Sequence, residues 1–214
     1  MSKILYDERR DYDGLALRRT DLSDDPHTLF DRWLSEARDA GIIDATAMTL
    51  ATVSEDGLPS ARIVLLKSFD SNGFVFFTNM DSAKGGDLTR NPVASLLFYW
   101  RDMERQVRIN GSVSHVSREE AEHYFHQRPT DSRFSAVASK QSEPVAGRDE
   151  LEARVAQLHR EFPDGNVPCP PSWGGYRVRA ETIEFWQGRP NRLHDRFVYA
   201  RDAQQAWHAT RLCP

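Results

Sequence analysis

The 214-residue sequence has only two cysteines, Cys169 and Cys213, and they form neither a metal-binding nor a redox-active spacing. It has no apolar run long enough to span a membrane, and its first residues carry charges where a signal peptide needs an apolar segment. It also lacks the basic excess of a general nucleic-acid coat, because 28 Lys and Arg against 32 Asp and Glu give a net charge of -4. These absences predict a cytoplasmic protein that binds neither membranes nor nucleic acid.

Sequence signals of several common enzyme classes are missing as well. No Gly-x-Gly-x-x-Gly motif follows a predicted strand, and there is neither a Walker-type phosphate loop nor the serine-centred elbow of a hydrolase. His123 and His126 are three residues apart on a predicted helix, but no third ligand occurs at a metal-site spacing. We interpret both histidines as surface or packing residues and predict no metal site.

The pattern of apolar residues predicts a mainly β protein with peripheral helices. Strands are predicted at 49–53, 62–67, 73–78, 93–100, 106–116, 176–180, 182–186, 197–200 and 207–211. Helices are predicted from 26 to about 40, from 81 or 82 to before 92, from 117 to about 128, and at 147–161. Because short turns join the strands, this order favours a closed antiparallel barrel over a doubly wound sheet. We expect a mobile N-terminal arm over residues 1–25 and a single domain over 26–214.

Two cations stand at the ends of the second predicted strand. The Asp56-Gly57 turn signal predicts a hairpin whose second strand begins at Arg62 and ends at Lys67. Side chains alternate along a strand, so these two, an odd number of residues apart, should point to opposite faces. Two interpretations stay open: both are ordinary solvated charges at strand ends, or each binds a different anionic group.

Three further clusters carry groups that could do chemistry. Lys84 follows Asp81 and Ser82 at a helix start, where free backbone N–H groups suit a phosphate. A second cluster offers one guanidinium and several further donors; it contains Tyr124, Arg128, Ser132 and the stretch 139–142. The third is the segment 183–196, IEFWQGRPNRLHDR. If that segment is extended, Arg192, His194 and Arg196 share one face, which requires an anion or an electron-rich ring opposite them.

This third segment resembles the signature of the pyridoxamine 5′-phosphate oxidase family, flavin enzymes that make pyridoxal 5′-phosphate. Other parts of the sequence match that family in the same order: RIVLLK at 62–67, Phe77 with Thr78, Gln106, YFHQRP at 124–129 and KQS at 140–142. The resemblance extends from about Arg9 to Pro214, which is nearly the whole chain. It implies an FMN-binding split β-barrel that works as a homodimer with FMN at the subunit interface.

The resemblance also implies a role for individual residues. The residues that would bind FMN are Arg62, Ile63, Val64, Leu65, Leu66, Lys67, Phe77, Thr78, Lys84, Gln106, Gln141, Ser142, Trp186 and Arg196. Those that would bind the substrate are Arg9, Arg10, Asp11, Tyr12, Lys67, Tyr124, Arg128, Ser132, Arg192, Leu193 and His194. Within this second set, Arg192 and His194 would contact the reacting pyridine ring as catalytic residues, and Arg9 to Tyr12 would close over the site as a lid.

The implied reaction converts pyridoxamine or pyridoxine 5′-phosphate to pyridoxal 5′-phosphate, with O2 as acceptor and H2O2 as product. One alternative is a related flavin oxidase of a phenazine-type ring, which would not need the substrate-phosphate set of Lys67, Tyr124, Arg128 and Ser132. Another is a non-enzymatic FMN or pyridoxal-phosphate binding module, which would not need the Arg192 and His194 pair. One departure from the family concerns the cofactor: Ala83 stands where relatives have an arginine beside the phosphate lysine.

Overall fold

The computed structural model describes residues 10–214, so the predictions for residues 1–9, among them Arg9, lie outside the described residues. Contacts divide the chain into two compact units. The first unit comprises Met1–Met48, Leu96–Asn110 and Glu181–Pro214, and the second comprises Thr49–Ser95 and Gly111–Ala180. Each unit is built from segments that lie far apart in the sequence.

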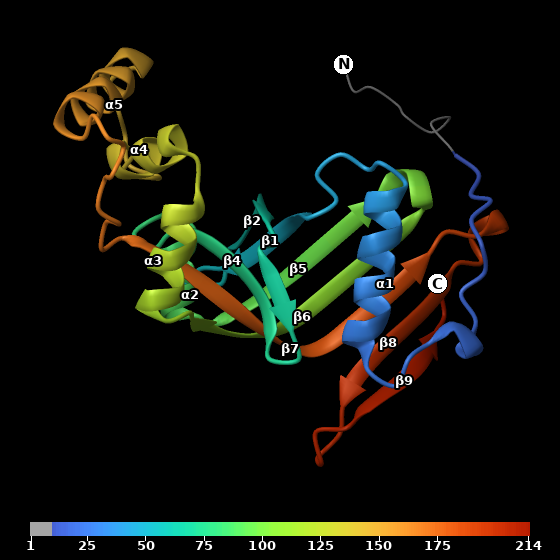
Figure 1. The fold of residues 1–214 in the computed structure, drawn as a ribbon. Coiled ribbons are helices and arrows are strands. Elements are labelled where there is room, and N and C mark those ends of the chain that lie inside the picture. Colours follow the sequence, from blue (N-terminus) through green and yellow to red (C-terminus); the bar gives the residue numbers. More distant parts are fainter. Residues whose placement is uncertain (1–9) are drawn as a thin grey trace, which may run out of the picture. The chain divides into compact units, whose positions relative to one another are not determined.

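Strands dominate the described chain, as predicted (Figure 1). They are β1 Ala47–Val53, β2 Pro59–Leu65, β3 Ser68–Asp70, β4 Gly73–Asn79, β5 Val93–Trp100, β6 Arg105–His115, β7 Trp173–Gln187, β8 Asp195–Arg201 and β9 Trp207–Leu212. Among the described residues these nine strands form one sheet in the order β2-β1-β5-β6-β7-β4-β3, while β8 pairs with β7 and β9 with β8. The prediction of a mainly β fold with peripheral helices is confirmed.

The first unit packs helix α1, Pro26–Asp39, against its part of the sheet. Asp25 accepts a hydrogen bond from the His27 N–H at the helix start, as the capping signal predicts. The helix buries one apolar face on aromatic side chains: Phe30 lies 5.0 Å from Phe98, and Trp33 lies 5.2 Å from Phe185, ring centre to ring centre. This core fixes the strands β7 and β8, which together with the turn between them contain the segment 183–196.

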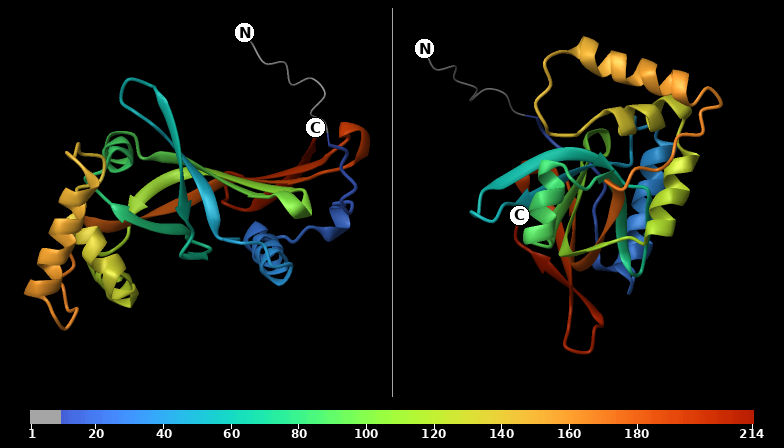
Figure 2. Two further views of the ribbon diagram at one scale, coloured as in Figure 1. Left: turned by 90° about the horizontal axis from the view of Figure 1, so that it is seen from above. Right: turned by 90° about the vertical axis from the view of Figure 1, so that its left-hand side faces the viewer.

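The second unit carries the other helices, α2 Ala83–Arg90, α3 Arg118–Gln127, α4 Thr130–Ala138 and α5 Arg148–Glu161. Figure 2 shows α3, α4 and α5 grouped together at one end of this unit. Ser117 accepts from the Glu120 N–H at the start of α3, as its capping signal predicts. Glycine at position 111 permits a close backbone approach, since a Cβ there would lie 1.9 Å from the Arg179 carbonyl oxygen.

The structure differs from the predicted elements in several places, one of which is the short strand β3, which was not predicted. Helix α4 was not predicted, because it is short and buries only Phe134 and Ala138, which gives a weak helical period. The two strands predicted at 176–180 and 182–186 are one long strand, β7. Strand β2 ends at Leu65, so the alternation that was expected to separate Arg62 from Lys67 does not reach Lys67.

Candidate functional site

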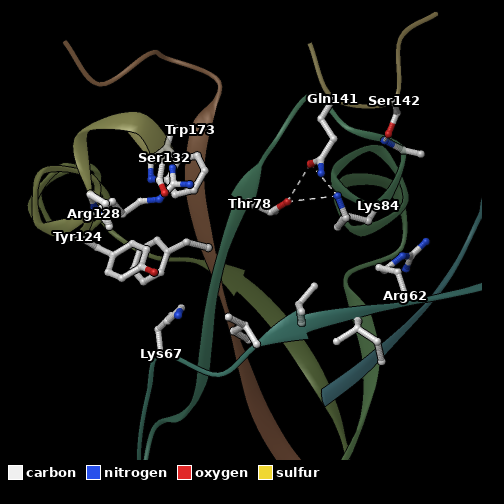
Figure 3. A pocket seen from close by; sticks show the side chains of 16 residues that line it. Arg62, Lys67, Thr78, Lys84, Tyr124, Arg128, Ser132, Gln141, Ser142 and Trp173 are labelled. Atoms are coloured by element: carbon white, nitrogen blue, oxygen red, sulfur yellow. Dashed lines mark hydrogen bonds between the residues drawn. The ribbon is translucent and has the colours of Figure 1, made fainter. Parts of the chain in front are cut away.

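The second unit contains a pocket of about 710 Å³ whose walls come from β2, β4, α2, α3, α4 and the turn after α4 (Figure 3). Its lining residues are Arg62, Ile63, Val64, Leu65, Lys67, Phe77, Thr78, Ala83, Lys84, Tyr124, Arg128, Pro129, Ser132, Gln141, Ser142 and Trp173. Most of the predicted cofactor and substrate residues of this unit are therefore brought together. Leu66 is the exception among the described ones, because its side chain is buried away from the pocket.

One end of the pocket is formed by Arg62 and Lys84. The Lys84 ammonium donates to the Ser82 hydroxyl and the Gln141 side-chain oxygen, both at 2.9 Å, and to Thr78 Oγ1 at 3.2 Å. All three acceptors are neutral. Among the described residues, no carboxylate lies within ion-pair distance of this buried ammonium, so its charge is solvated only by dipoles.

Electrostatics at this end favour an anion. Burial and, to a smaller extent, the nearby positive charge of Arg62 lower the pKa of Lys84 to about 8. The Arg62 guanidinium is held in place by hydrogen bonds of 2.7 Å to Thr52 Oγ1 and Ser60 Oγ. Two like charges held side by side without an acidic partner are unfavourable until an anion joins them.

The start of helix α2 lies at the same end. Its first residue, Ala83, donates its backbone N–H to Ser142 Oγ at 3.2 Å. Ser142 has a φ of 76°, a left-handed conformation that is costly for a residue other than glycine. That turn places Gln141 and Ser142 against the helix start, and the helix dipole adds to the positive potential there.

The opposite end of the pocket is formed by Lys67, Tyr124, Arg128 and Ser132 (Figure 3). The Lys67 ammonium lies 5.8 Å from the centre of the Tyr124 ring, which in turn stacks on Phe77 at 4.2 Å. Burial lowers the pKa of Arg128, and its Nη1 has no hydrogen-bond partner among the described residues. This end therefore also presents two cations and two hydroxyls with no acidic partner in the described part of the chain.

Trp173 is a pocket residue that the sequence did not single out. It is the first residue of β7, and the Arg128 guanidinium lies 4.2 Å above its ring. The ring face fixes the plane of the guanidinium, which keeps the direction of its N–H groups constant. A tryptophan directly after a proline-rich connection gives no pattern from which this contact could have been predicted.

The first unit holds a second group of predicted residues, formed by Tyr12, Trp186 and His194. Tyr12 makes edge-to-face contacts with Trp186 at 5.7 Å and with His194 at 5.3 Å, and the Trp186 and His194 rings are 4.6 Å apart. The pairing of β7 with β8 places Trp186 directly opposite Arg196. These residues come from the described N-terminal segment and from both sides of the turn between β7 and β8.

The structure fixes the proton position on His194. The backbone N–H of Arg189 donates to His194 Nδ1 at 3.0 Å, so in the neutral ring the proton is on Nε2. Burial lowers the pKa of His194, the positive charge of Arg192 lowers it too, and the Glu104 carboxylate opposes both. His194 is therefore a neutral ring at neutral pH, with an Nε2–H that can donate a hydrogen bond.

Arg192 lies in a strained turn and not in an extended segment. The prediction that an extended segment places Arg192, His194 and Arg196 on one face is therefore wrong. Asn191 and Arg192 have φ angles of 57° and 61°, and the Leu193 N–H donates to the Pro190 carbonyl. Two successive left-handed residues make a type I′ turn, which favours Asn and Gly at these positions. An arginine at the second of them adopts this conformation at a cost in free energy.

Family models match two parts of this chain. The model described as pyridoxamine 5′-phosphate oxidase matches residues 34–160, and the model described as the pyridoxine 5′-phosphate oxidase C-terminal dimerisation region matches 173–214. The chain is 52% identical to pyridoxine/pyridoxamine 5′-phosphate oxidase 1 of Hydrogenovibrio crunogenus over 97% of its own length and 96% of that protein. It is 50% identical to the pyridoxine/pyridoxamine 5′-phosphate oxidase of Microcystis aeruginosa over the full length of both.

The chain belongs to the pyridoxamine 5′-phosphate oxidase family. Its fold is similar to the crystal structure of PhzG from Burkholderia lata 383 in complex with tetrahydrophenazine-1-carboxylic acid, with a TM-score of 0.89 and 34% identity. That comparison covers 96% of this chain and 100% of PhzG. The predicted fold class, a split β-barrel with peripheral helices, is confirmed, and membership of this family implies a flavin cofactor.

The other residues predicted to bind cofactor or substrate lie mostly in the first unit. Arg10, Asp11, Tyr12 and Arg192 line a cavity of the first unit together with Arg189 and Asn191. Gln106 is half-buried in β6, Leu193 is exposed, and Arg196 pairs with Glu184 at 2.7 Å. The described part of this oxidase-family chain contains no cluster of three metal-ligating side chains and no helix long and apolar enough to cross a membrane.

Proposed function

We propose that this protein oxidises pyridoxamine 5′-phosphate and pyridoxine 5′-phosphate to pyridoxal 5′-phosphate, with FMN as cofactor, O2 as acceptor and H2O2 as product. The observation that carries the proposal is the pair of cationic groups at opposite ends of one pocket. Arg62 and Lys84 with Ser142 suit the phosphate of FMN, and Lys67 and Arg128 with Tyr124 and Ser132 suit the phosphate of the substrate. FMN and the substrate carry one phosphate each, which matches the two cationic ends of the pocket.

The donor set fits a flavin monophosphate. Lys84 and Arg62 provide charge, and the Ser142 hydroxyl, which accepts from the Ala83 N–H at the α2 start, provides a donor to a phosphate oxygen. The side chain of Ile63, which is 64% exposed, gives an apolar edge to β2 along which a flat ring can lie. The absence of an adenine-nucleotide motif in the sequence also supports FMN over FAD.

The protein's part in the reaction is binding, orientation and electrostatics. Lys67 and Arg128 hold the substrate phosphate, which lies remote from the reacting carbon, so their binding energy serves to align the pyridine ring. Arg192 places a positive charge beside the ring, and His194 donates its Nε2–H to a ring substituent. The chemistry that bound FMN supplies is acceptance of a hydride from the substrate C4′ carbon and return of the electrons to O2.

The second candidate function is oxidation of a phenazine-type ring, which the similarity to PhzG favours. Sequence identity argues against this second function, since the chain is 34% identical to PhzG and 50–52% identical to the two pyridoxine/pyridoxamine 5′-phosphate oxidases. A ring with a carboxylate in place of a phosphate also offers fewer acceptor oxygens to the donors Lys67, Tyr124, Arg128 and Ser132.

The deciding experiment incubates the purified protein with FMN and pyridoxine 5′-phosphate in air. We expect aldehyde and H2O2 in equal amounts, and no turnover of pyridoxine without its phosphate. A dihydrophenazine carboxylic acid serves as the competing substrate. Turnover of that ring alone would establish the second function, and binding of both phosphates without peroxide would establish a non-enzymatic module.

We also propose a homodimer with FMN at the subunit interface and a cytoplasmic location. Support for the homodimer comes from residues 173–214, which match a dimerisation region and form β7, β8 and β9. The lid formed by the N-terminal segment, including Arg9, remains part of this proposal.

The affinity for FMN should fall as the pH rises above 8. The pKa of Lys84 in the free protein is lowered to about 8, so above that pH its ammonium loses the proton that the FMN phosphate needs. FMN binding then takes up a proton, and Kd should rise by up to about tenfold per pH unit between pH 8 and the higher pKa of the bound state. Fluorescence titrations at pH 7, 8 and 9 measure this slope, and Lys84→Met should flatten it. An equal slope in both proteins would assign the titration to another group.

Adding an arginine at the α2 start should strengthen FMN binding. Ala83 is exposed and lines the pocket beside Lys84, where a guanidinium could add a bidentate contact to the phosphate. We expect Ala83→Arg to tighten FMN binding by about 1 kcal/mol, less at high salt, with unchanged substrate selectivity. Titration of both apo proteins at low and high salt measures it. Unchanged or weaker binding would mean that Arg62 already supplies the second charge.

A further inference from the structure

Glu104 is a buried acid that no part of the proposed reaction uses. Its side chain is only 3% exposed, and it ends the 3-10 turn Arg101–Met103 that leads into β6. Its φ is 55°, a left-handed conformation that favours glycine. Burial of a carboxylate and a left-handed backbone both cost free energy, so the side chain must gain compensating contacts.

These contacts are all with the N-terminal segment. Glu104 Oε2 accepts from the backbone N–H groups of Asp13 at 3.0 Å and Gly14 at 2.8 Å. Oε1 accepts from Arg10 Nη2 at 3.0 Å. One carboxylate thus binds both ends of the segment Arg10–Gly14, which contains Tyr12. Arg189 adds a hydrogen bond from its guanidinium to the Gly14 carbonyl oxygen.

Close packing leaves Tyr12 little freedom once this segment is bound. A Cβ on Gly188 would lie 2.7 Å from Tyr12 Cδ1 and 2.9 Å from Glu104 Cβ. A Cβ on Gly14 would lie 2.4 Å from Gln187 Nε2. The two glycines let the segment approach β7 closely, and the Tyr12 ring then contacts Trp186 and His194.

We propose that Glu104 is a positioning residue that holds the segment Arg10–Gly14 in the place where Tyr12 packs on His194. It makes no contact with the substrate itself and acts through Tyr12. The expected effect of Glu104 on catalysis rests on the proposed function. Its expected effect on the position of the segment Arg10–Gly14 does not. The competing explanation is that Glu104 only stabilises the turn at Arg101–Met103.

Amide hydrogen exchange of the holoenzyme tests the positional part without any assay of activity. Glu104→Gly removes the carboxylate and relieves the left-handed backbone, so the turn itself should keep its structure. We expect the Asp13 and Gly14 amides to exchange at least tenfold faster, with a smaller increase in Glu104→Gln. The Leu17 amide, which donates to Asp195 at 3.0 Å, should change far less. Unchanged or slower exchange at Asp13 and Gly14 would overturn the proposal.

Asp202→Asn is the matched control. Asp202 also accepts two backbone N–H groups, those of Gln204 and Ala206, but these lie in the turn between β8 and β9. We expect this variant to leave the exchange of Asp13 and Gly14 unchanged. If it accelerates their exchange as much as Glu104→Gly does, the effect is general loss of stability, and the proposal is wrong.

A double-mutant cycle tests the route through Tyr12. With Tyr12 present, Glu104→Gly should raise the KM for pyridoxine 5′-phosphate about tenfold. In a Tyr12→Ala background the same change should raise it less than twofold, because the side chain through which Glu104 acts is already gone. Additive effects would overturn the role of Glu104 as a positioning residue. Absence of any turnover in the parent protein would instead contradict the proposed function and leave the exchange result standing.

Discussion

Arg192→Met is expected to lower kcat for pyridoxine 5′-phosphate about a hundredfold, while KM changes by less than about threefold. Arg192 lies beside His194 and does not line the pocket that carries the two phosphate-binding ends, so under the proposed function its charge should act mainly on the reacting ring. A group that acts in the transition state lowers kcat, whereas a group that binds substrate and transition state equally changes KM. Steady-state kinetics with FMN at saturation measure both constants.

The strained turn provides a control for this prediction. Arg192→Gly removes the same guanidinium but suits the φ of 61°, so it should lose as much turnover as Arg192→Met. Its free energy of unfolding should exceed that of Arg192→Met by about 0.5–1 kcal/mol. In both variants the pKa of His194 should rise, because one cause of its lowering is removed. A raised KM with unchanged kcat would show that Arg192 only binds the substrate.

The two ends of the pocket should respond separately to loss of their lysines. Lys67→Met is expected to raise the KM for pyridoxine 5′-phosphate about tenfold to a hundredfold and to leave the Kd for FMN within about twofold. Lys84→Met should do the reverse. Each change removes a charge-assisted hydrogen bond to a phosphate, with a cost of about 1.5–3 kcal/mol. The Lys67 side chain is exposed and contributes little to the stability of the fold. The expected rise in KM on Lys67→Met therefore reflects loss of the phosphate contact.

FMN titrations and substrate kinetics on Lys67→Met and Lys84→Met give a Kd for FMN and a KM for pyridoxine 5′-phosphate for each variant. Pyridoxine without its phosphate is the control ligand, since its binding to the protein should be insensitive to Lys67. If one variant weakens both ligands equally, the division of the pocket into two phosphate sites is wrong. If Lys67→Met affects neither ligand, Lys67 is an ordinary solvated charge between β2 and β3.

Local sequence signals determined much of this fold. Asp25 and Pro26 start α1, Ser117 and Glu120 start α3, and the strands from β1 to β6 were predicted to within a few residues, apart from the three-residue β3. These features depend on neighbours in the chain, which is why the sequence alone contains them. The resemblance to the family signature at 183–196 was equally visible, and it supplied the proposed site residues.

Tertiary structure decided how those residues are held. The contact of Trp173 with Arg128, the hydrogen bond from Lys84 to Gln141, and the binding of the N-terminal segment by Glu104 all join residues more than forty positions apart. The left-handed conformation of Arg192 likewise replaced an expected strand, because a tight turn between β7 and β8 outweighs the preference of one side chain. Sequence patterns report on neighbours along the chain, whereas charge, burial and strain at a site depend on which distant segments meet there.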